Sequence, residues 1–346
     1  MCGIYGMVSL SGAPLKHPDA LGRMAGALRH RGPDDAGLVR RPDAAMGCER
    51  LRITDRRPEG SQPFTDPSGS VWLTLNGAIY NAEALRQRHG TFPYRSRSDV
   101  EPVLPAFLAG GASVIGEIDG MFALAVWDAS ARQLVLARDR AGEKPLFCLS
   151  WEDELWFASE VQALLCHPTF PLVEDREAAA LFLALGYIPG TRTGFRDIRK
   201  VEPGTVMTVR PERTEIQRYW SPGAVPRNRA SAGEAIAQVG DLLQTAVRKQ
   251  LAADVPVGVL ASGGVDSSLI LAMAARQQPR HRIVAFSVGF PDTSYDERGD
   301  AAYASGYCGA PLVICISVIS NRSGDAPAAV QRRSSSSRNH NDVPPP

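Results

Sequence analysis

The chain opens with Met1-Cys2-Gly3-Ile4-Tyr5-Gly6, which places a cysteine one residue from the N-terminus. A side chain as small as that of Cys2 permits removal of Met1, and Cys2 would then carry a free α-amino group beside its thiol. An α-amine has a pKa of about 8, so near neutral pH it is partly uncharged and can accept the thiol proton. A nucleophile and base on one residue are typical of N-terminal-nucleophile catalysis. The alternative is a chance cysteine in a chain that keeps Met1.

Six short motifs follow in order along the first half of the chain. They are His30 to Asp34, Arg50 to Asp55, Asn76 to Asn81, Ser98 to Glu101, Asp119 to Ala123 and Ala137 to Arg140. Each motif alone is a weak signal, but six in register are a strong one. Together they closely resemble the class II glutamine amidotransferase domain, and we assign that domain to residues 2–210. The resemblance implies an N-terminal-nucleophile α/β/β/α sandwich, and the mixture of period-two segments and helical segments suits it.

The resemblance implies catalytic roles for three residues. The Cys2 thiolate would attack the side-chain amide of glutamine and form a thioester. Asn76 and the backbone amide of Gly77 would form the oxyanion hole for the tetrahedral intermediate. Taken alone, Asn76-Gly77 would indicate only a tight turn, because Asn-Gly is the commonest turn dipeptide.

Four further residues would bind the glutamine. Arg50 would bind the α-carboxylate with its planar, two-pronged guanidinium, and Asp99 would pair with the α-ammonium. Backbone groups near Ile53 and Thr54 would line the same pocket. Each has a simpler alternative, such as a solvated face for Arg50 or a helix cap for Asp99.

Ala78 departs from the family pattern, which usually reads Asn-Gly-Glu at this point. That Glu helps to hold the substrate ammonium, so its absence removes a charge-assisted contact worth about 1.5–3 kcal/mol. Because the nucleophile and the oxyanion groups are retained, we predict weakened rather than abolished glutamine hydrolysis.

The second half opens after a linker predicted over residues 211–232, which contains Pro222, Gly223 and Pro226. Helical spacing is expected over 233–251, and a short apolar strand at 256–260 runs into the Ser/Gly-rich stretch 261–268. A helix over 269–276 and a strand over 283–288 follow. A strand, a glycine turn and a helix N-terminus together form a phosphate cradle, since the helix end supplies free N–H groups.

Ser262-Gly263-Gly264-Val265-Asp266-Ser267 resembles the signature of the pyrophosphate-loop ATP hydrolases and contains no Walker A lysine. The resemblance implies the start of a doubly wound parallel sheet that binds ATP at the carboxyl ends of its strands. Mg²⁺ would bridge the phosphates and engage Asp266. The ATP-binding residues would be Leu260, Ser262, Gly263, Gly264, Asp266, Ser267 and Val288. A serine-rich turn without a ligand is the alternative.

The two domains together resemble the glutamine-hydrolysing asparagine synthetases, which are ATP-dependent carbon–nitrogen ligases. This implies that aspartate is activated as aspartyl-adenylate and that ammonia from glutamine displaces AMP to give asparagine. An amidotransferase that acts on another carboxylate in a secondary-metabolite or cell-surface pathway stays open, as does a glutamine-binding fragment without turnover. Sugar-isomerase or phosphoribosyl partners are disfavoured by the loop at 262–267. A homodimer is left open.

The end of the chain does not follow the family pattern. The resemblance covers a partial ATP-binding domain over 233–305, and an apolar run over 311–319 then precedes a stretch rich in Arg, Ser and Pro. We therefore predict an aberrant, disordered tail over 306–346 and a frameshift near 304–310. A sheet cut after its second strand would leave an exposed edge. On this basis we expect a truncated chain that hydrolyses glutamine without making asparagine; a genuine short protein is the alternative.

Composition sets the remaining bounds. A length of 346 residues predicts two domains, and a net charge of +1 gives no reason to expect binding to nucleic acid or an anionic membrane. The six cysteines show no paired spacing and are expected to be reduced, and the six histidines form no metal-ligand pattern, so no metal site is predicted. With no signal peptide or membrane span, we expect a cytoplasmic protein.

Overall fold

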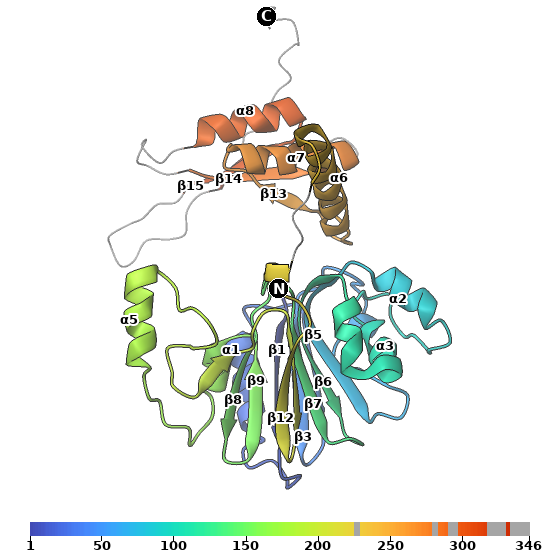
Figure 1. The fold of residues 1–346 in the computed structure, drawn as a ribbon, viewed down its shortest axis with the longest axis vertical. Coiled ribbons are helices and arrows are strands. Elements are labelled where there is room, and N and C mark those ends of the chain that lie inside the picture. The colour runs from blue at the N-terminus through green and yellow to red at the C-terminus, as the bar shows by residue number, and fades with distance from the viewer. Residues whose placement is uncertain (225–228, 279–282, 290–296, 317–329, 333–346) are drawn as a thin grey trace, which may run out of the picture. The chain divides into compact units, whose positions relative to one another are not determined.

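The computed structural model describes residues 1–224, 229–278, 283–289, 297–316 and 330–332. The chain divides into two compact units, Met1–Pro226 and Arg227–Pro346 (Figure 1).

Two six-stranded antiparallel sheets form the centre of the first unit, as Figure 1 shows. One has the strand order β10-β8-β9-β1-β3-β2 and the other β12-β11-β7-β6-β5-β4. The strands of the first sheet are β1 (Gly3–Ser9), β2 (Asp35–Arg40), β3 (Ala44–Arg50), β8 (Phe147–Trp151), β9 (Glu154–Ala158) and β10 (Ile198–Lys200). Those of the second are β4 (Phe64–Thr65), β5 (Val71–Ile79), β6 (Gly120–Asp128), β7 (Gln133–Arg138), β11 (Thr205–Arg210) and β12 (Arg213–Arg218).

Helices cover the outer faces of both sheets. α1 (Ala20–Leu28) and α4 (Val161–Leu164) pack on the first sheet, and α2 (Ala82–Arg88) and α3 (Val103–Gly110) on the second. α5 (Arg176–Leu185) begins after Asp175, whose carboxylate accepts a hydrogen bond from the Ala178 amide. Short 3₁₀ turns lie at Pro58–Gly60, Gly111–Glu117 and Pro222–Ala224.

A third apolar core lies between the two sheets. Strand alternation separates the layers: on β5, Trp72 faces the first sheet, whereas Leu73 and Leu75 face the helices. This arrangement confirms the predicted α/β/β/α sandwich. The helical patterns of the sequence predict helices over 18–28, 82–89, 100–108, 159–165 and 176–185. All five are present, and their bounds shift by three residues at most.

The sequence predicts a strand over 71–75 that ends at Asn76-Gly77, and β5 is longer than this. It continues through Ile79 because Gly77 pairs with Phe122 and Ala78 with Met121 on β6. The Asn76-Gly77 pair is therefore part of a sheet and not a turn.

The predicted linker over 211–232 also needs correction. β12 occupies Arg213–Arg218 and pairs along its whole length with β11. All six of its residues are exposed, so the strand carries no apolar alternation that the sequence could reveal. The next helix, α6 (Ala232–Gln250), begins with a capping box formed by Ser231 and Glu234.

The second unit contains a four-stranded sheet of order β13-β14-β15-β16, in which the first three strands are parallel. Strands and helices alternate along the chain as β13 (Gly258–Leu260), α7 (Val265–Gln277), β14 (Val284–Gly289), α8 (Arg298–Cys308) and β15 (Leu312–Ile316); β16 is Val330–Arg332. The order β-α-β-α-β is the expected beginning of a parallel α/β domain.

Two predictions about the end of the chain are wrong for the described residues. α8 extends to Cys308, and Leu312–Ile316 forms β15, so order does not stop at residue 305. The sheet is not cut after its second strand, because the apolar run beginning at 311 supplies the third strand and pairs with β14. Residues 317–329 and 333–346 lie outside the described residues.

Candidate functional site: the Cys2 region and the 262–267 loop

Cys2 lies just before β1 and is partly buried. The Nε of Arg31 donates a hydrogen bond to its carbonyl oxygen (3.0 Å), and its Sγ lies 3.9 Å from the carbonyl oxygen of Leu51. Arg31 is held in turn by Glu160, which accepts from its Nη1 at 2.6 Å. The first of the six motifs contains Arg31, but no role for this side chain follows from the sequence. The structure indicates that Arg31 fixes the start of the chain.

The thiol of Cys2 is acidic for a cysteine. A hydrogen bond with the side chain of Cys48 is the largest cause that lowers its pKa to about 6, with further help from the Leu51 backbone and the charge of Arg50. Burial acts in the opposite direction. At neutral pH the thiolate therefore predominates, and the thiolate is the nucleophilic form.

The α-amino group in this structure belongs to Met1. Burial lowers the pKa of that amine, and Lys144 lies close, with its Nζ 3.3 Å from the Met1 sulfur. Cys2 and Asp34 act in the opposite direction to burial, whereas Arg31 and Lys144 also lower the pKa of the Met1 amine.

Asn76 lies on the face of β5 that points between the two sheets, like Trp72 and Thr74. It is 1% exposed, and its Nδ2 is buried without a hydrogen-bond partner in the described part of the chain. β5 contacts β1 and β3 across the sandwich, and Cys2 packs into the same inter-sheet core. An unpaired buried amide donor is costly, so its presence beside this core marks a candidate site.

The backbone at Gly77 tolerates no side chain. A Cβ built there would lie 2.0 Å from the carbonyl oxygen of Met121 on the neighbouring strand. Gly77 is therefore required by close strand packing, in addition to any role of its amide.

Arg50, Thr54 and Asp99 form one hydrogen-bonded group. The Thr54 hydroxyl donates to Oδ1 of Asp99 (2.6 Å), and the Ile79 amide donates to Oδ2 (2.7 Å). Asp99 thus joins the loop after β3 to the end of β5, and it does not cap α3, which begins at Val103. The other two predicted pocket residues are Ile53, which is 40% exposed, and Ala78, which is partly buried beside Ile79.

The guanidinium of Arg50 is 4% exposed and already bonded to backbone. Its Nη2 donates to the carbonyl oxygens of Thr54 (3.0 Å) and Asp55 (2.6 Å), and its Nη1 to that of Arg57 (3.3 Å). Both two-pronged edges of a guanidinium include Nη2. Arg50 therefore cannot make the predicted two-pronged contact with a carboxylate in this state. To make it, Nη2 would have to give up its hydrogen bond to a carbonyl oxygen of the 51–57 loop.

Gln62 supports this region without having been predicted to do so. Its Nε2 donates to the Leu75 carbonyl oxygen (2.9 Å), and its Oε1 accepts from the Leu75 amide (2.6 Å). Because Leu75 immediately precedes Asn76, this paired contact fixes the strand that carries the amide. The only sequence signal was that the second motif, Arg50 to Asp55, runs on to Gln62-Pro63.

The 262–267 loop connects β13 to the N-terminus of α7. The Ser262 hydroxyl accepts from the Gly264 amide (3.4 Å) and lies 3.1 Å from the Ser267 hydroxyl. Gly264 is the N-cap residue of α7, so the backbone N–H groups of the first helical turn have no carbonyl acceptor within the helix. Asp266 lies in the first helical turn and is exposed. This geometry fits an anion such as a phosphate group.

Leu260 and Val288 lie on the same exposed face of the parallel sheet. Leu260 pairs with Phe286, and Val288 follows two residues later on β14. The exposed fractions of the three side chains are 79%, 37% and 47% for Leu260, Phe286 and Val288. The structure thus places apolar side chains beside the loop, where a flat aromatic ring could rest.

Replacing Gly263 with alanine should destabilise the second unit by about 2–4 kcal/mol. Gly263 has φ +90°, and a Cβ there would lie 2.4 Å from the Cβ of Asp300 and 2.6 Å from the amide nitrogen of Ala301. Hydrogen exchange of the α7 amides in increasing urea would measure the change. In the control Gly240→Ala, on α6, a Cβ meets nothing within 4 Å, so stability should be retained or slightly increased. Equal behaviour of the two variants would contradict the prediction.

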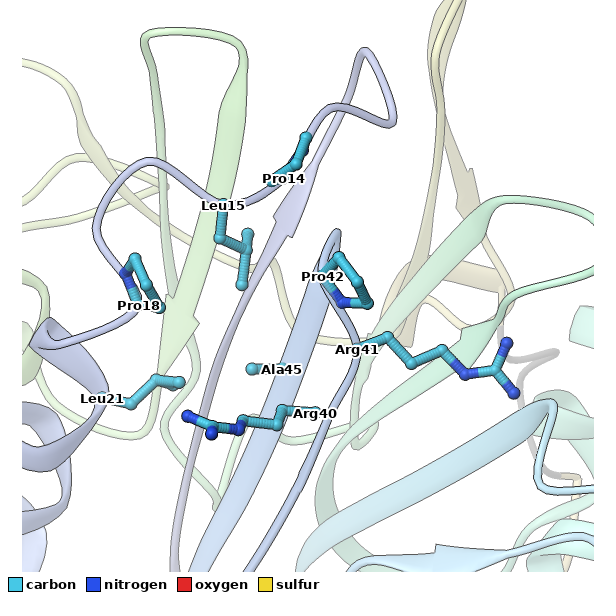
Figure 2. Close-up of a pocket in the computed structure, with 8 residues that line it drawn as sticks. All are labelled: Pro14, Leu15, Pro18, Leu21, Arg40, Arg41, Pro42 and Ala45. Carbon is cyan, nitrogen blue, oxygen red and sulfur yellow. The ribbon is translucent and has the colours of Figure 1, made fainter.

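A cavity lies near the end of β1 opposite to Cys2, and Figure 2 shows the side chains that line it. It has a volume of about 440 Å³ and lies between the segment after β1, the start of α1 and the β2–β3 hairpin. Its lining is Pro14, Leu15, Pro18, Leu21, Arg40, Arg41, Pro42 and Ala45. None of these residues was predicted to act in catalysis or to bind glutamine.

Two further predictions concern metal binding and membrane spans. Among the residues that the structure describes, there is no group of three or more His, Cys, Asp or Glu side chains that could hold a metal ion. The absence of a structural metal stays a prediction. No helix in the described part of the chain has the length and apolar character needed to cross a membrane.

A family model described as a glutamine amidotransferase domain matches residues 1–220. The chain belongs to the glutamine amidotransferase family. A second model, described as asparagine synthase, matches residues 238–322 of this family member. That match continues past residues 304–310, where we expected the resemblance to stop.

Several named relatives match most of this glutamine amidotransferase chain. Glutamine-hydrolysing asparagine synthetase 3 of Bacillus subtilis (strain 168) is 34% identical over 281 residues, which is 80% of this chain and 45% of the relative. A putative glutamine-hydrolysing asparagine synthetase of Mycobacterium tuberculosis (strain ATCC 25618 / H37Rv) is 33% identical over 336 residues, or 88% and 50%. Amidase chry2 of Gibberella zeae is 33% identical over 291 residues, or 80% and 43%. The chain spans about half the length of these curated relatives.

Proposed function

We propose that the first unit hydrolyses glutamine to glutamate and ammonia, with Cys2 as the nucleophile. The observation that carries the proposal is the buried Nδ2 of Asn76, which has no hydrogen-bond partner among the described residues and lies on the inter-sheet face toward which Cys2 packs. A preformed donor that has no partner in the resting protein is suited to a negative charge that exists only during the reaction.

The reaction would begin once Met1 is removed. The α-amine of Cys2 accepts the thiol proton, the thiolate attacks the amide carbon of glutamine, and a C–S bond forms. The charge on the amide oxygen is stabilised by Asn76 and the Gly77 amide. The α-ammonium of Cys2 then gives its proton to the departing nitrogen, and ammonia leaves as the C–N bond breaks. Water attacks the thioester, the α-amine accepts a proton from that water, and glutamate is released with Cys2 restored.

Glutamine would be held by the group that joins Arg50, Thr54 and Asp99. The Asp99 carboxylate already accepts two short hydrogen bonds, which fix its position for an ammonium. Arg50 would take the carboxylate after one backbone carbonyl of the 51–57 loop gives up its place on Nη2. With Ala78 in place of an acidic residue, Asp99 carries the ammonium alone, and weaker glutamine binding stays a prediction.

We further propose that ammonia is used by the second unit to amidate a carboxylate, with aspartate as the substrate and asparagine as the product. The match to asparagine synthase and the similarity to asparagine synthetases support this. ATP, when bound, supplies the activation of the carboxylate. Ser262, Gly263, Gly264 and Ser267 would hold its phosphates, Leu260 and Val288 would lie beside the adenosine, and Asp266 would engage Mg²⁺.

A different acceptor carboxylate is the second candidate. The similarity to amidase chry2 favours it, because that relative matches the same extent of the chain at nearly the same identity. The glutamine-hydrolysing step would be the same in both cases.

The proposal is tested by measuring ammonia release from glutamine by the purified protein without ATP or aspartate. Intact mass should first establish that Met1 has been removed. We expect steady release of ammonia, and γ-glutamyl hydroxamate in the presence of hydroxylamine, because hydroxylamine intercepts the thioester. Glutamine binding with neither product would instead support a binding module without turnover.

A further inference from the structure

A second thiol lies beside Cys2 and has no part in the proposed reaction. In the pairing of β1 with β3, Gly3 faces Glu49 and Ile4 faces Cys48. Cys2 precedes Gly3, so alternation places its side chain on the same face as Ile4 and diagonal to Cys48. Both thiols belong to the core between the sheets, where Cys48 is fully buried.

The proton of the Cys48 thiol has two acceptors within reach. One is the carbonyl oxygen of Glu49, which lies 3.7 Å from the Cys48 sulfur and accepts its hydrogen bond. The other is the sulfur of Cys2, which lies diagonally across the strand pair and becomes an acceptor once Cys2 is ionised. A charged acceptor makes the stronger bond, so ionisation of Cys2 turns the proton toward its sulfur. Burial and the bond with Cys2 raise the pKa of Cys48 well above its ordinary value, so Cys48 keeps its proton while Cys2 loses one.

We propose that Cys48 is a positioning residue for glutamine hydrolysis, whose thiol donates a hydrogen bond that stabilises and orients the Cys2 thiolate before glutamine arrives. The catalytic consequence rests on the proposed function, whereas the thiol interaction does not. Other charged groups also act on this end of the chain, and they come from different elements. They are the α-amino group, Arg31, Asp34, Arg50 and Lys144. Removing Cys48 should therefore raise the pKa of Cys2 only part of the way back to its ordinary value.

The test is the pH dependence of alkylation of Cys2 by iodoacetamide, followed by peptide mass spectrometry on the intact, Met1-free protein. Wild-type alkylation should reach half its maximum rate below the ordinary pKa range of a cysteine thiol, in the direction in which the pKa of Cys2 is shifted. In Cys48→Ala the midpoint should rise by about one pH unit, as expected for loss of a charge-assisted hydrogen bond. Cys48→Ser retains a hydrogen-bond donor of nearly the same volume, so its midpoint should stay close to that of the wild type.

Cys148→Ala is the matched control. Cys148 is another buried thiol of the inter-sheet core, and burial raises its pKa to about 11. Its removal should leave the Cys2 midpoint unchanged. The proposal is overturned if Cys48→Ala and Cys48→Ser both retain the wild-type midpoint, or if Cys148→Ala shifts it as much as Cys48→Ala does.

Glutamine kinetics supply a second readout. In Cys48→Ala, kcat should fall about fivefold at the pH of the wild-type alkylation midpoint and hardly at all two pH units above it, with KM unchanged, because only the thiolate fraction differs. A fall in kcat that is equal at both pH values would count against the proposal. If no form of the protein hydrolyses glutamine, the proposed function fails, but the alkylation midpoints still decide the role of Cys48.

Discussion

Cys2→Ala should lower the rate of ammonia release from glutamine by at least about a thousand-fold, since removal of a catalytic nucleophile typically costs that much or more. The expected loss follows from the position of Cys2 at the start of β1 and from its pKa of about 6, which keeps it ionised at neutral pH. Alanine leaves no atom that can form the thioester, so ammonia release and γ-glutamyl hydroxamate formation should be lost together. Binding of glutamine, measured by calorimetry, should change much less.

The matched control for this variant is Cys166→Ala. Cys166 is also partly exposed, but burial raises the pKa of its thiol, and its Sγ contacts the Gln162 carbonyl oxygen at 3.6 Å. Its removal should leave turnover within about twofold of wild type, as is usual for a substitution that touches no special feature. A Cys2→Ala protein that retains a tenth or more of the wild-type rate would show that another group is the nucleophile.

The first unit could be predicted from sequence because its signals are local. Alternating apolar residues indicate strands that bury one or both faces, and each helix carries an apolar stripe within a short window. β12 was missed because every one of its residues is exposed and only pairing with β11 defines it. The extension of β5 through Gly77 likewise depends on β6, which lies some forty residues later.

The candidate site was predictable as a set of residues but not as a network. Motif order brought Cys2, Asn76 and Asp99 together, yet nothing local relates Arg31 to the Cys2 carbonyl or Cys48 to the Cys2 thiol. Such contacts depend on strand register, which is set by the whole sheet. The engagement of Arg50 by three backbone carbonyls depends on the path of the 51–57 loop, and no motif specifies that path.

Asn76→Ala should lower kcat about 100- to 1,000-fold while changing KM little, as found when one oxyanion donor is removed. The donor would act only on the tetrahedral intermediate, so substrate binding has little to lose. Stability should behave differently from activity. The Asn76 Nδ2 is buried and has no hydrogen-bond partner in the described part of the chain. Replacing Asn76 with alanine therefore breaks no hydrogen bond of this amide group. The free energy of unfolding should therefore stay the same or rise, which urea titration can measure.

Thr74→Val separates this effect from a general disturbance of β5. Thr74 lies two residues earlier on the same face, is 0% exposed, and also has a buried side-chain oxygen without a partner among the described residues. Valine has nearly its shape, so turnover should stay within about twofold of wild type and stability should be retained or increased. A similar loss of kcat in both variants would mean that catalysis depends on the packing of this strand rather than on the amide. If kcat falls in Asn76→Ala alone and stability is retained, the amide acts on the oxyanion. Removal of a purely structural residue would lower both kcat and the free energy of unfolding.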